Sequence, residues 1–401
     1  MSPPIAPKFP EELTVHGETR IDDYYWLKHR GDDLVLKYLT DENLYLDKAM
    51  AHTKLLRETL YQEMTNRLAD SEISVPYLNN GYLYRKVYSA DADYPLYQRK
   101  TADSDIAEWE TILDVNDLAN EAEYVEVDWL IPSPNNHLMS FSMDTTGNYE
   151  YDIRFINLIT GKVLSDRIHK TWGGCVWSHD SKVVYFNVKD QNTNRVAEVK
   201  SHRLGFENSK DKTIYFEKDS TFSAYIDQSM TDRYLYIACE STTSSEYRIL
   251  DLSNRKSKLK VFSPREKDHL YYPYHHKNVF YILSNKNAIN FKVMKTHIDS
   301  TEQTNWIEVI PHNREVNPVQ IMPFRDFLVF KEHRNGLPNF SIYDIQMDST
   351  YTLKFNDVSY HVGFSDNHDF DSEFFRYKYS SLKTPDQVID YYPESQEKKV
   401  K

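Results

Sequence analysis

The sequence predicts an all-β protein, a seven-bladed β-propeller preceded by a short N-terminal helical extension. The main observation is a pair of strand patterns that recurs seven times: a short apolar and aromatic strand, a polar turn, and a second strand in which apolar and polar residues alternate. A propeller blade of four strands takes about 40–50 residues, which agrees with the spacing of these units. Helical repeats of similar length would place apolar residues three and four apart, and these segments alternate instead.

The seven strand pairs cover most of the chain after residue 80. They occupy residues 82–85 with 95–99, 138–143 with 151–157, 183–188 with 199–204, 234–238 with 246–252, 279–283 with 290–296, 327–331 with 339–344, and 375–379 with 387–391. Subtracting the numbers of successive equivalent positions gives steps of 57, 44, 52, 45, 47 and 48 residues for Tyr84, Phe141, Tyr185, Ile237, Ile282, Val329 and Tyr377. We therefore predict a propeller over residues 71–401.

The composition supports this prediction. A chain of 401 residues is too long for one ordinary hydrophobic core, whereas a propeller can grow because each blade packs only on its neighbours. The 31 tyrosines suit half-buried strands, since the ring is apolar and the hydroxyl can stay wet.

Residues 1–70 are predicted to form an N-terminal arm and helices. The arm contains the run Asp22-Asp23-Tyr24-Tyr25-Trp26-Leu27, whose aromatics and carboxylates suit docking against another surface or, alternatively, a local turn with an aromatic plug. Either Asp32 or Asp33 can cap a helix that begins there. Farther on, an apolar stripe of Leu56, Leu60, Met64 and Leu68 predicts a helix whose stripe packs in a core.

The search for catalytic motifs gives a negative result. Gly-x-Ser-x-Gly, a phosphate loop, a dinucleotide fingerprint and His-Glu-x-x-His do not occur in a sequence with only 10 glycines. The run from Asp369 resembles the start of a calcium loop, but Phe374 stands where the sharp turn needs glycine. His275 and His276 are adjacent, so on a strand they would point to opposite faces and make a poor metal site. We expect no cofactor and no metal.

Charge and cysteine content narrow the choice of partner. The formal net charge of −13 disfavours nucleic acid. It would attract cationic ligands such as basic peptides, but charge alone favours the simpler interpretation of an acidic, soluble protein. The two cysteines, Cys175 and Cys239, are too few for a disulfide framework, and no apolar run is long enough for a membrane span. We expect a cytoplasmic protein without membrane contact.

An arginine or a pair of carboxylates could form a ligand site in the propeller channel. Arg154, on an otherwise apolar strand, is a candidate for binding a substrate carboxylate, although such an arginine more often pairs with a neighbouring blade. A propeller glycosidase would need two carboxylates facing each other across the channel, and 61 acidic residues single out no such pair.

Several ordered motifs carry a family resemblance. They are Pro3-Pro4, His16-Gly17-Glu18-Thr19-Arg20, Asp22-Asp23-Tyr24-Tyr25-Trp26-Leu27, Gly81-Tyr82-Leu83-Tyr84-Arg85, Trp109-Glu110-Thr111-Ile112-Leu113-Asp114 and Tyr379-Ser380-Ser381-Leu382-Lys383-Thr384-Pro385-Asp386. With these motifs the whole chain resembles the prolyl oligopeptidase family of serine peptidases, in its oligopeptidase B branch. The run from Asp22 to Leu27 is the sharpest of them.

The resemblance implies a division of labour. In this family an N-terminal extension and a seven-bladed propeller precede a C-terminal α/β-hydrolase domain, which supplies the catalytic Ser, Asp and His and an acidic pocket for Lys or Arg. The propeller restricts the active site to short peptides. The 401 residues end where such a domain would begin, so no catalytic residue can be assigned and the chain by itself is expected to be inactive. Asp22, Asp23, Tyr24, Tyr25 and Trp26 become candidates for docking the hydrolase domain. The alternative is a stand-alone propeller that binds peptides or proteins.

Overall fold

The computed structural model describes residues 2–69, 71–104, 106, 108–120, 122–190 and 193–401. The chain divides into two compact units, Met1–Asp70 and Ser71–Lys401. Each unit is considered by itself.

The N-terminal unit consists of a hairpin followed by helices. Strands β1 (Glu11–Val15) and β2 (Glu18–Asp22) pair antiparallel. After them come the 3₁₀ turn η1 (Tyr25–Lys28), helix α1 (Asp33–Ala49), the 3₁₀ turn η2 (Ala51–Thr53) and helix α2 (Lys54–Thr65). The predicted cap is confirmed at Asp32, whose side chain accepts a hydrogen bond of 2.8 Å from the Leu34 backbone N–H.

Helix α2 carries three of the four residues of the predicted apolar stripe, and the fourth, Leu68, follows the helix and is exposed. The stripe does not pack in a core within this unit. None of the twelve residues of α2 is buried. Leu56 is 59% exposed, Leu60 46% and Met64 59%. The prediction of core packing was wrong here. Within this short unit the helices follow one another along the chain, and no second layer of secondary structure covers the stripe.

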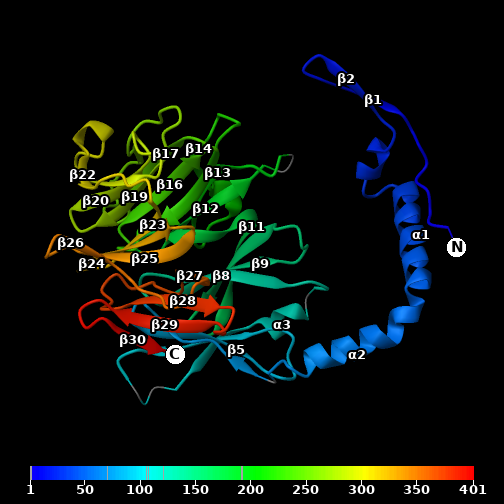
Figure 1. The fold of residues 1–401 in the computed structure, drawn as a ribbon, viewed down its shortest axis with the longest axis horizontal. Coiled ribbons are helices and arrows are strands. Elements are labelled where there is room, and N and C mark those ends of the chain that lie inside the picture. Colours follow the sequence, from blue (N-terminus) through cyan, green and yellow to red (C-terminus); the bar gives the residue numbers. More distant parts are fainter. Residues whose placement is uncertain (1, 70, 105, 107, 121, 191–192) are drawn as a thin grey trace. The chain divides into compact units, whose positions relative to one another are not determined.

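The Ser71–Lys401 unit is built of antiparallel sheets in chain order (Figure 1). The first contains β3 (Glu72–Ile73), β4 (Tyr77–Asn79), β5 (Tyr82–Tyr88), β6 (Leu96–Thr101) and β7 (Glu110–Asp114), followed by α3 (Val115–Ala119). The second has seven strands: β8 (Glu126–Pro132), β9 (Leu138–Asp144), β10 (Tyr151–Asn157), β11 (Lys162–Trp177), β12 (Val183–Lys189), β13 (Val196–Arg203) and β14 (Lys212–Phe216), with η3 (Asn208–Lys210) before β14.

Four sheets of four strands complete the unit. They are β15 (Ser223–Gln228), β16 (Tyr234–Glu240), β17 (Ser245–Asp251) and β18 (Lys260–Val261); β19 (Tyr271–His276), β20 (Val279–Ser284), β21 (Lys292–His297) and β22 (Ile307–Ile310), with η4 (Gln303–Asn305); β23 (Val316–Pro323), β24 (Phe327–Arg334), β25 (Leu337–Asp344) and β26 (Ser349–Thr352); and β27 (Tyr360–Phe364), β28 (Phe375–Ser381), β29 (Gln387–Tyr392) and β30 (Glu397–Val400).

The seven-stranded sheet is two blades that share strand β11. The first part of this 16-residue strand pairs with β10, from Lys162 to Thr171, and the last part pairs with β12, from Thr171 to Trp177. The register of the second pairing shifts between Thr171 and Cys175, where Gly173 and Gly174 both have positive φ. Counting this sheet as two, the described residues form the seven blades that the repeat predicts.

All seven predicted strand pairs are the two middle strands of a blade. They correspond to β5 with β6, β9 with β10, β12 with β13, β16 with β17, β20 with β21, β24 with β25, and β28 with β29. The middle strands are covered on both faces by neighbouring blades, so their apolar pattern is the strongest. The apolar clusters lie accordingly between consecutive blades, as with Phe155, Trp177 and Phe186 between the second and third.

Side chains join the last blade to the first. Arg376 on β28 donates a hydrogen bond of 2.6 Å to the carbonyl oxygen of Pro76, and the His368 ring lies 4.8 Å from that of Tyr77. Figure 1 shows β28–β30 beside β5. The blades therefore close into a ring around a shared centre.

Candidate functional site

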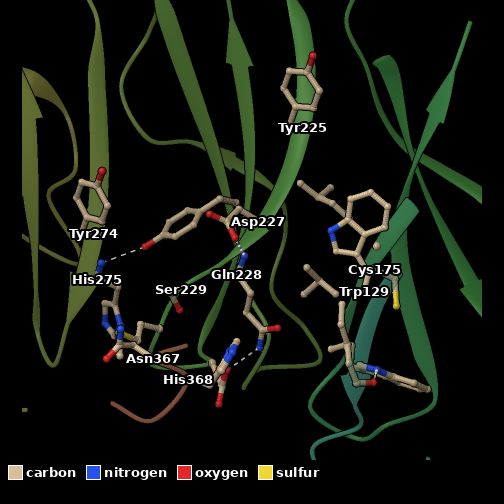
Figure 2. Close-up of a pocket in the computed structure, with 18 of the residues that line it drawn as sticks. Trp129, Cys175, Tyr225, Asp227, Gln228, Ser229, Tyr274, His275, Asn367 and His368 are labelled. Carbon is tan, nitrogen blue, oxygen red and sulfur yellow. Dashed lines mark hydrogen bonds between the residues drawn. The ribbon is translucent and has the colours of Figure 1, made fainter. Parts of the chain in front are cut away.

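The blades enclose a central cavity of about 1150 Å³. Its walls come mainly from the first strand of successive blades, which contribute Trp129 from β8, Trp172 from β11, Asp227 from β15 and His275 from β19 (Figure 2). Strand β23, the residues around Asn80 and the segment before β28 complete the lining. Because every blade contributes, this central cavity is a property of the ring and of no single repeat.

Trp129 takes its place in the wall because two glycines make room for it. Its own φ is +48°, and the pairing of β8 with β9 shifts in register around it. A Cβ atom at Gly173 would lie 2.1 Å from the Trp129 ring, and the ring also meets Tyr151 edge-on at 5.0 Å. Only a residue without a side chain lets the indole lie flat against β11 at this point.

Two carboxyl groups face the central cavity from the fourth blade. Asp227 accepts a 2.7 Å hydrogen bond from the Gln228 backbone N–H, and the Gln228 amide nitrogen donates to Asp232 at 3.1 Å. Both side chains are exposed in the cavity wall, and protein surrounds them on several sides. This desolvation raises the pKa of Asp227, and, together with the negative charge of Asp369, raises the pKa of Asp232 to about 6.

Two histidines of the cavity wall, His275 and His368, are neutral at neutral pH. His275 is 3% exposed, its backbone N–H donates to the Tyr236 hydroxyl at 3.1 Å, and its ring hydrogen-bonds with Thr231 at 2.5 Å. Burial lowers the pKa of His275 to about 4 and also lowers the pKa of His368. The carboxyl groups of the described lining are those of Asp227 and Asp232, and Lys331 is its one lysine or arginine.

The two adjacent histidines point apart, as expected from their positions on a strand. His275 faces the fourth blade, whereas the His276 ring hydrogen-bonds with the Arg325 carbonyl oxygen at 3.0 Å. Within the described part of the chain, no three histidine, cysteine or acidic side chains gather as metal ligands.

Arg154 lies on β10, the third strand of the second blade, in register with Phe141 and Arg167 on the adjacent strands. The cavity wall of that blade comes from β8, and Arg154 is not among the residues that line the cavity. A contact between Arg154 and a substrate stays a prediction.

The docking candidates of the arm form local contacts inside the N-terminal unit. The Trp26 indole N–H donates to the Pro7 carbonyl oxygen at 3.0 Å, and its ring meets Phe9 and Tyr38 edge-on at 5.6 and 6.4 Å. Trp26 thus ties the N-terminal segment to α1, which is the role of the aromatic plug.

The other members of the motif shape the turn or remain accessible. Asp22 accepts a hydrogen bond from the Tyr24 backbone N–H, Asp23 forms an ion pair with Lys8 at 2.9 Å, and the Lys28 ammonium lies over the Tyr25 ring at 3.4 Å. Tyr24 remains 42% exposed. Their part in docking a second domain stays a prediction.

Sequence reasoning missed the carboxylates and rings of the cavity wall. The available signal was the alternation of Tyr225 and Asp227, which places an aromatic ring and a charge on one face of β15, the same face that carries exposed residues. Without the ring closure, nothing in the sequence distinguishes this face from the other solvated strand faces.

Comparison with known proteins identifies the family. The sequence model of the protein family described as the prolyl oligopeptidase N-terminal β-propeller domain matches residues 4–401 of this chain. The chain belongs to the prolyl oligopeptidase family. This assignment agrees with the resemblance seen in the sequence, and it leaves no support for the glycosidase alternative.

Several relatives align over nearly the whole chain. Dipeptidyl aminopeptidase BI of Pseudoxanthomonas mexicana is 33% identical over 96% of the chain and 55% of its own length. Protease 2 of Moraxella lacunata is 29% identical over 96% of the chain and 56% of its own length. The structure of oligopeptidase B from Leishmania major superposes with a TM-score of 0.93 at 27% identity, over 100% of this chain and 60% of that one.

The chain therefore spans a little over half the length of the relatives it matches. Across the residues that the structure describes, none of the helices has the length and apolar character of a membrane span.

Proposed function

We propose that this chain is the N-terminal and propeller portion of an oligopeptidase B-like serine peptidase, which hydrolyses short peptides after lysine or arginine. The supporting observation is the pattern of coverage. Relatives named as peptidases align over 96% of this chain, and the alignment leaves more than 40% of their length for a further domain. In this proposal the further domain is the hydrolase domain.

The propeller would act by controlling access. A central cavity of about 1150 Å³ has room for a short peptide and for no folded protein. Its carboxylates, in a protein of net charge −13, would draw basic peptides toward the centre. Size and charge would thus select substrates before any chemistry begins.

The N-terminal unit would support the hydrolase domain. The stripe of Leu56, Leu60 and Met64 lies uncovered on α2, and covering it would remove apolar surface from water. In the motif of residues 22–27, the exposed ring of Tyr24 could contact the same partner.

Catalysis would come entirely from the partner domain. Serine hydrolysis needs a nucleophile beside a base, together with donors aimed at the oxyanion, and the 401 residues contain no nucleophile-elbow motif. We also propose a cytoplasmic location, since both Cys175 and Cys239 are free thiols.

The mass of the native protein in its source cells tests the proposal. A species much heavier than 47.5 kDa that reacts with a serine-hydrolase probe is the expected result. A native mass of 47.5 kDa without labelling would overturn it. As a further check, the pure 401-residue chain should not hydrolyse an arginyl reporter peptide.

Docking is tested in the longer form of the protein. Leu60→Lys should loosen the hydrolase domain and lower turnover, because it places a charge in the apolar stripe. Gln62→Lys is the matched control, since it adds the same charge to an exposed position about 200° around the helix from Leu60. Removal of residues 22–27 with unchanged turnover and domain association would contradict the docking role.

A second candidate function is a stand-alone propeller that binds peptides. The observation that favours it is the cavity wall, because the propeller by itself forms this wall and leaves Tyr225 and Asp227 accessible there. It would become the leading proposal if the native mass were 47.5 kDa.

A further inference from the structure

We propose that the fourth-blade wall of the central cavity is a binding site for a guanidinium group, formed by the carboxylate of Asp227 and the ring of Tyr225. The ligand would be an arginine side chain of a short peptide. The evidence that the site binds cations is the geometry of the wall. Its use in admitting substrates rests on the function proposed above.

The first argument is the state of the Asp227 carboxylate. Its one hydrogen bond in the described structure is that from the Gln228 backbone N–H, which occupies one oxygen. No ion pair to a described lysine, arginine or histidine accompanies it, in contrast to buried Asp390, which is paired with Arg376. The Asp227 side chain is exposed in the cavity wall, so its carboxylate is open to a cationic ligand.

The second argument is the position of the Tyr225 ring. Tyr225 and Asp227 are two residues apart on β15 (Figure 2), so their side chains project from the same face of the strand. The backbone positions of two such residues are roughly 6.6 Å apart. Tyr225 is 37% exposed and is backed by the Trp172 ring at 6.3 Å. A cation is attracted to the face of such a ring within about 6 Å.

The arrangement favours arginine over lysine. A planar guanidinium can stack on the Tyr225 ring while two of its N–H groups donate to the Asp227 carboxylate, whereas an ammonium offers a point charge without a face to stack.

Both basic and acidic side chains also lie near this wall. Lys331 is the one lysine or arginine of the described lining, and the Lys189 ammonium, at the end of β12 in the third blade, lies 6.0 Å from the centre of the Trp172 ring. Asp232 accepts from Gln228 and stands beside a further negative charge, that of Asp369. His275 and His368 are neutral at neutral pH and add no repulsion.

Isothermal titration of the 401-residue chain tests the site. The ligands are the blocked tripeptide acetyl-Gly-Arg-Gly-amide and its citrulline counterpart, which has nearly the same shape and no charge. The arginine peptide should bind at least roughly tenfold more tightly, and the difference should shrink as salt is raised.

Asp227→Asn should abolish this discrimination, because asparagine keeps the acceptor for Gln228 and loses the charge. Asp299→Asn is the control: it changes the net charge by the same amount at a side chain that is 81% exposed. Tyr225→Leu should weaken arginine binding several-fold and leave the charge effect in place. Equal melting temperatures would show that the variants are folded.

Equal binding of the two peptides by the wild-type protein, or undiminished arginine binding by Asp227→Asn, would overturn the site. Its failure is distinct from that of the proposed function. Arginine binding by a protein of native mass 47.5 kDa would leave the site standing as a peptide-capture site, and a heavier, probe-labelled enzyme without arginine binding would leave the peptidase proposal standing alone.

Discussion

At the scale of single residues, Gly173 decides the shape of the cavity wall. Its φ of +108° is one that side chains rarely adopt, and the Trp129 indole occupies the space where a Cβ would lie. The backbone conformation and the packing at position 173 both require glycine.

Gly173→Ala should destabilise the propeller by about 2–4 kcal/mol, since strain and overpacking add together. The control is Gly205→Ala, where φ is +84° and no atom lies within 4 Å of the new Cβ, so only the strain of about 1–2 kcal/mol applies. Urea unfolding of both variants measures the difference, and equal losses would show that Trp129 is free to move away.

Asp232 makes a pH-dependent contribution to stability. In the folded protein its pKa is about 6, above the ordinary value of 3.8, because burial and Asp369 disfavour the charge. The folded state therefore holds this proton more tightly than the unfolded state does. The resulting cost is absent near pH 4, develops as the pH rises to about 6, and is fully present above that.

Asp232→Asn should accordingly raise the melting temperature more at pH 7.5 than at pH 4, by roughly 1–3 °C, because solvent screens this accessible group. Comparing the two pH values removes the effect of the turn, whose φ of +57° asparagine also tolerates. A gain of the same size at both pH values would mean that the charge of Asp232 is not destabilising.

At the scale of elements, β28 and β29 carry the ion pair that accompanies ring closure. Arg376 is 6% exposed and Asp390 1%, with an Nε–Oδ1 distance of 2.6 Å. The same guanidinium donates to the Pro76 carbonyl oxygen of the first blade. Asp390 therefore positions the Arg376 side chain where the last blade meets the first.

Asp390→Ala should cost about 3–5 kcal/mol, because it leaves the Arg376 charge buried without its counterion. Glu397→Ala in the same sheet removes a partner from an exposed pair with Lys399 and should cost about 1 kcal/mol or less. Thermal unfolding of both variants checks this, and a loss at Asp390 as small as at Glu397 would show that water compensates Arg376.

At the scale of the whole molecule, the chain divides into two compact units, Met1–Asp70 and Ser71–Lys401. The propeller has its own cores between blades, whereas the helices of the N-terminal unit bury a single residue, Val35. The propeller should therefore fold without the N-terminal unit.

Limited proteolysis should cut between α2 and β3 and leave a stable fragment that begins near residue 71. The fragment should keep the far-UV circular dichroism of a β protein and lose the helical signal. Rapid digestion of the propeller itself, with the helices surviving, would contradict this division.

Much of the fold could be predicted because its pattern is local. Alternation within five to seven residues marks strands such as those containing Phe141 and Val329, which are fully buried between blades. The outer strands were not predicted, since β18 and β30 are short or exposed and carry a weak pattern. The sharing of β11 between two blades was also not predicted, because the residues of one long strand do not indicate where its pairing changes from one neighbouring strand to another.

The candidate site depended on contacts that the sequence does not display. The sequence singles out Arg154 because it interrupts an apolar strand. The cavity is lined mainly by the first strands of the blades and Arg154 lies on a third strand, so its contact with a substrate stays a prediction. Asp227 was passed over as one of 61 acidic residues, because its accessibility and its lack of a basic partner appear only when seven blades are closed around it.

The sequence by itself determined the blade count, the order of the strand pairs and the family, because periodicity and motifs are properties of residues close together in the chain. The tertiary structure alone decided which side chains meet at the centre: Trp129, Asp227 and His275 belong to different blades and come together around one cavity. The physical reason is that ring closure is a long-range event, in which the desolvation and charge of each wall residue are set by blades far away in the sequence.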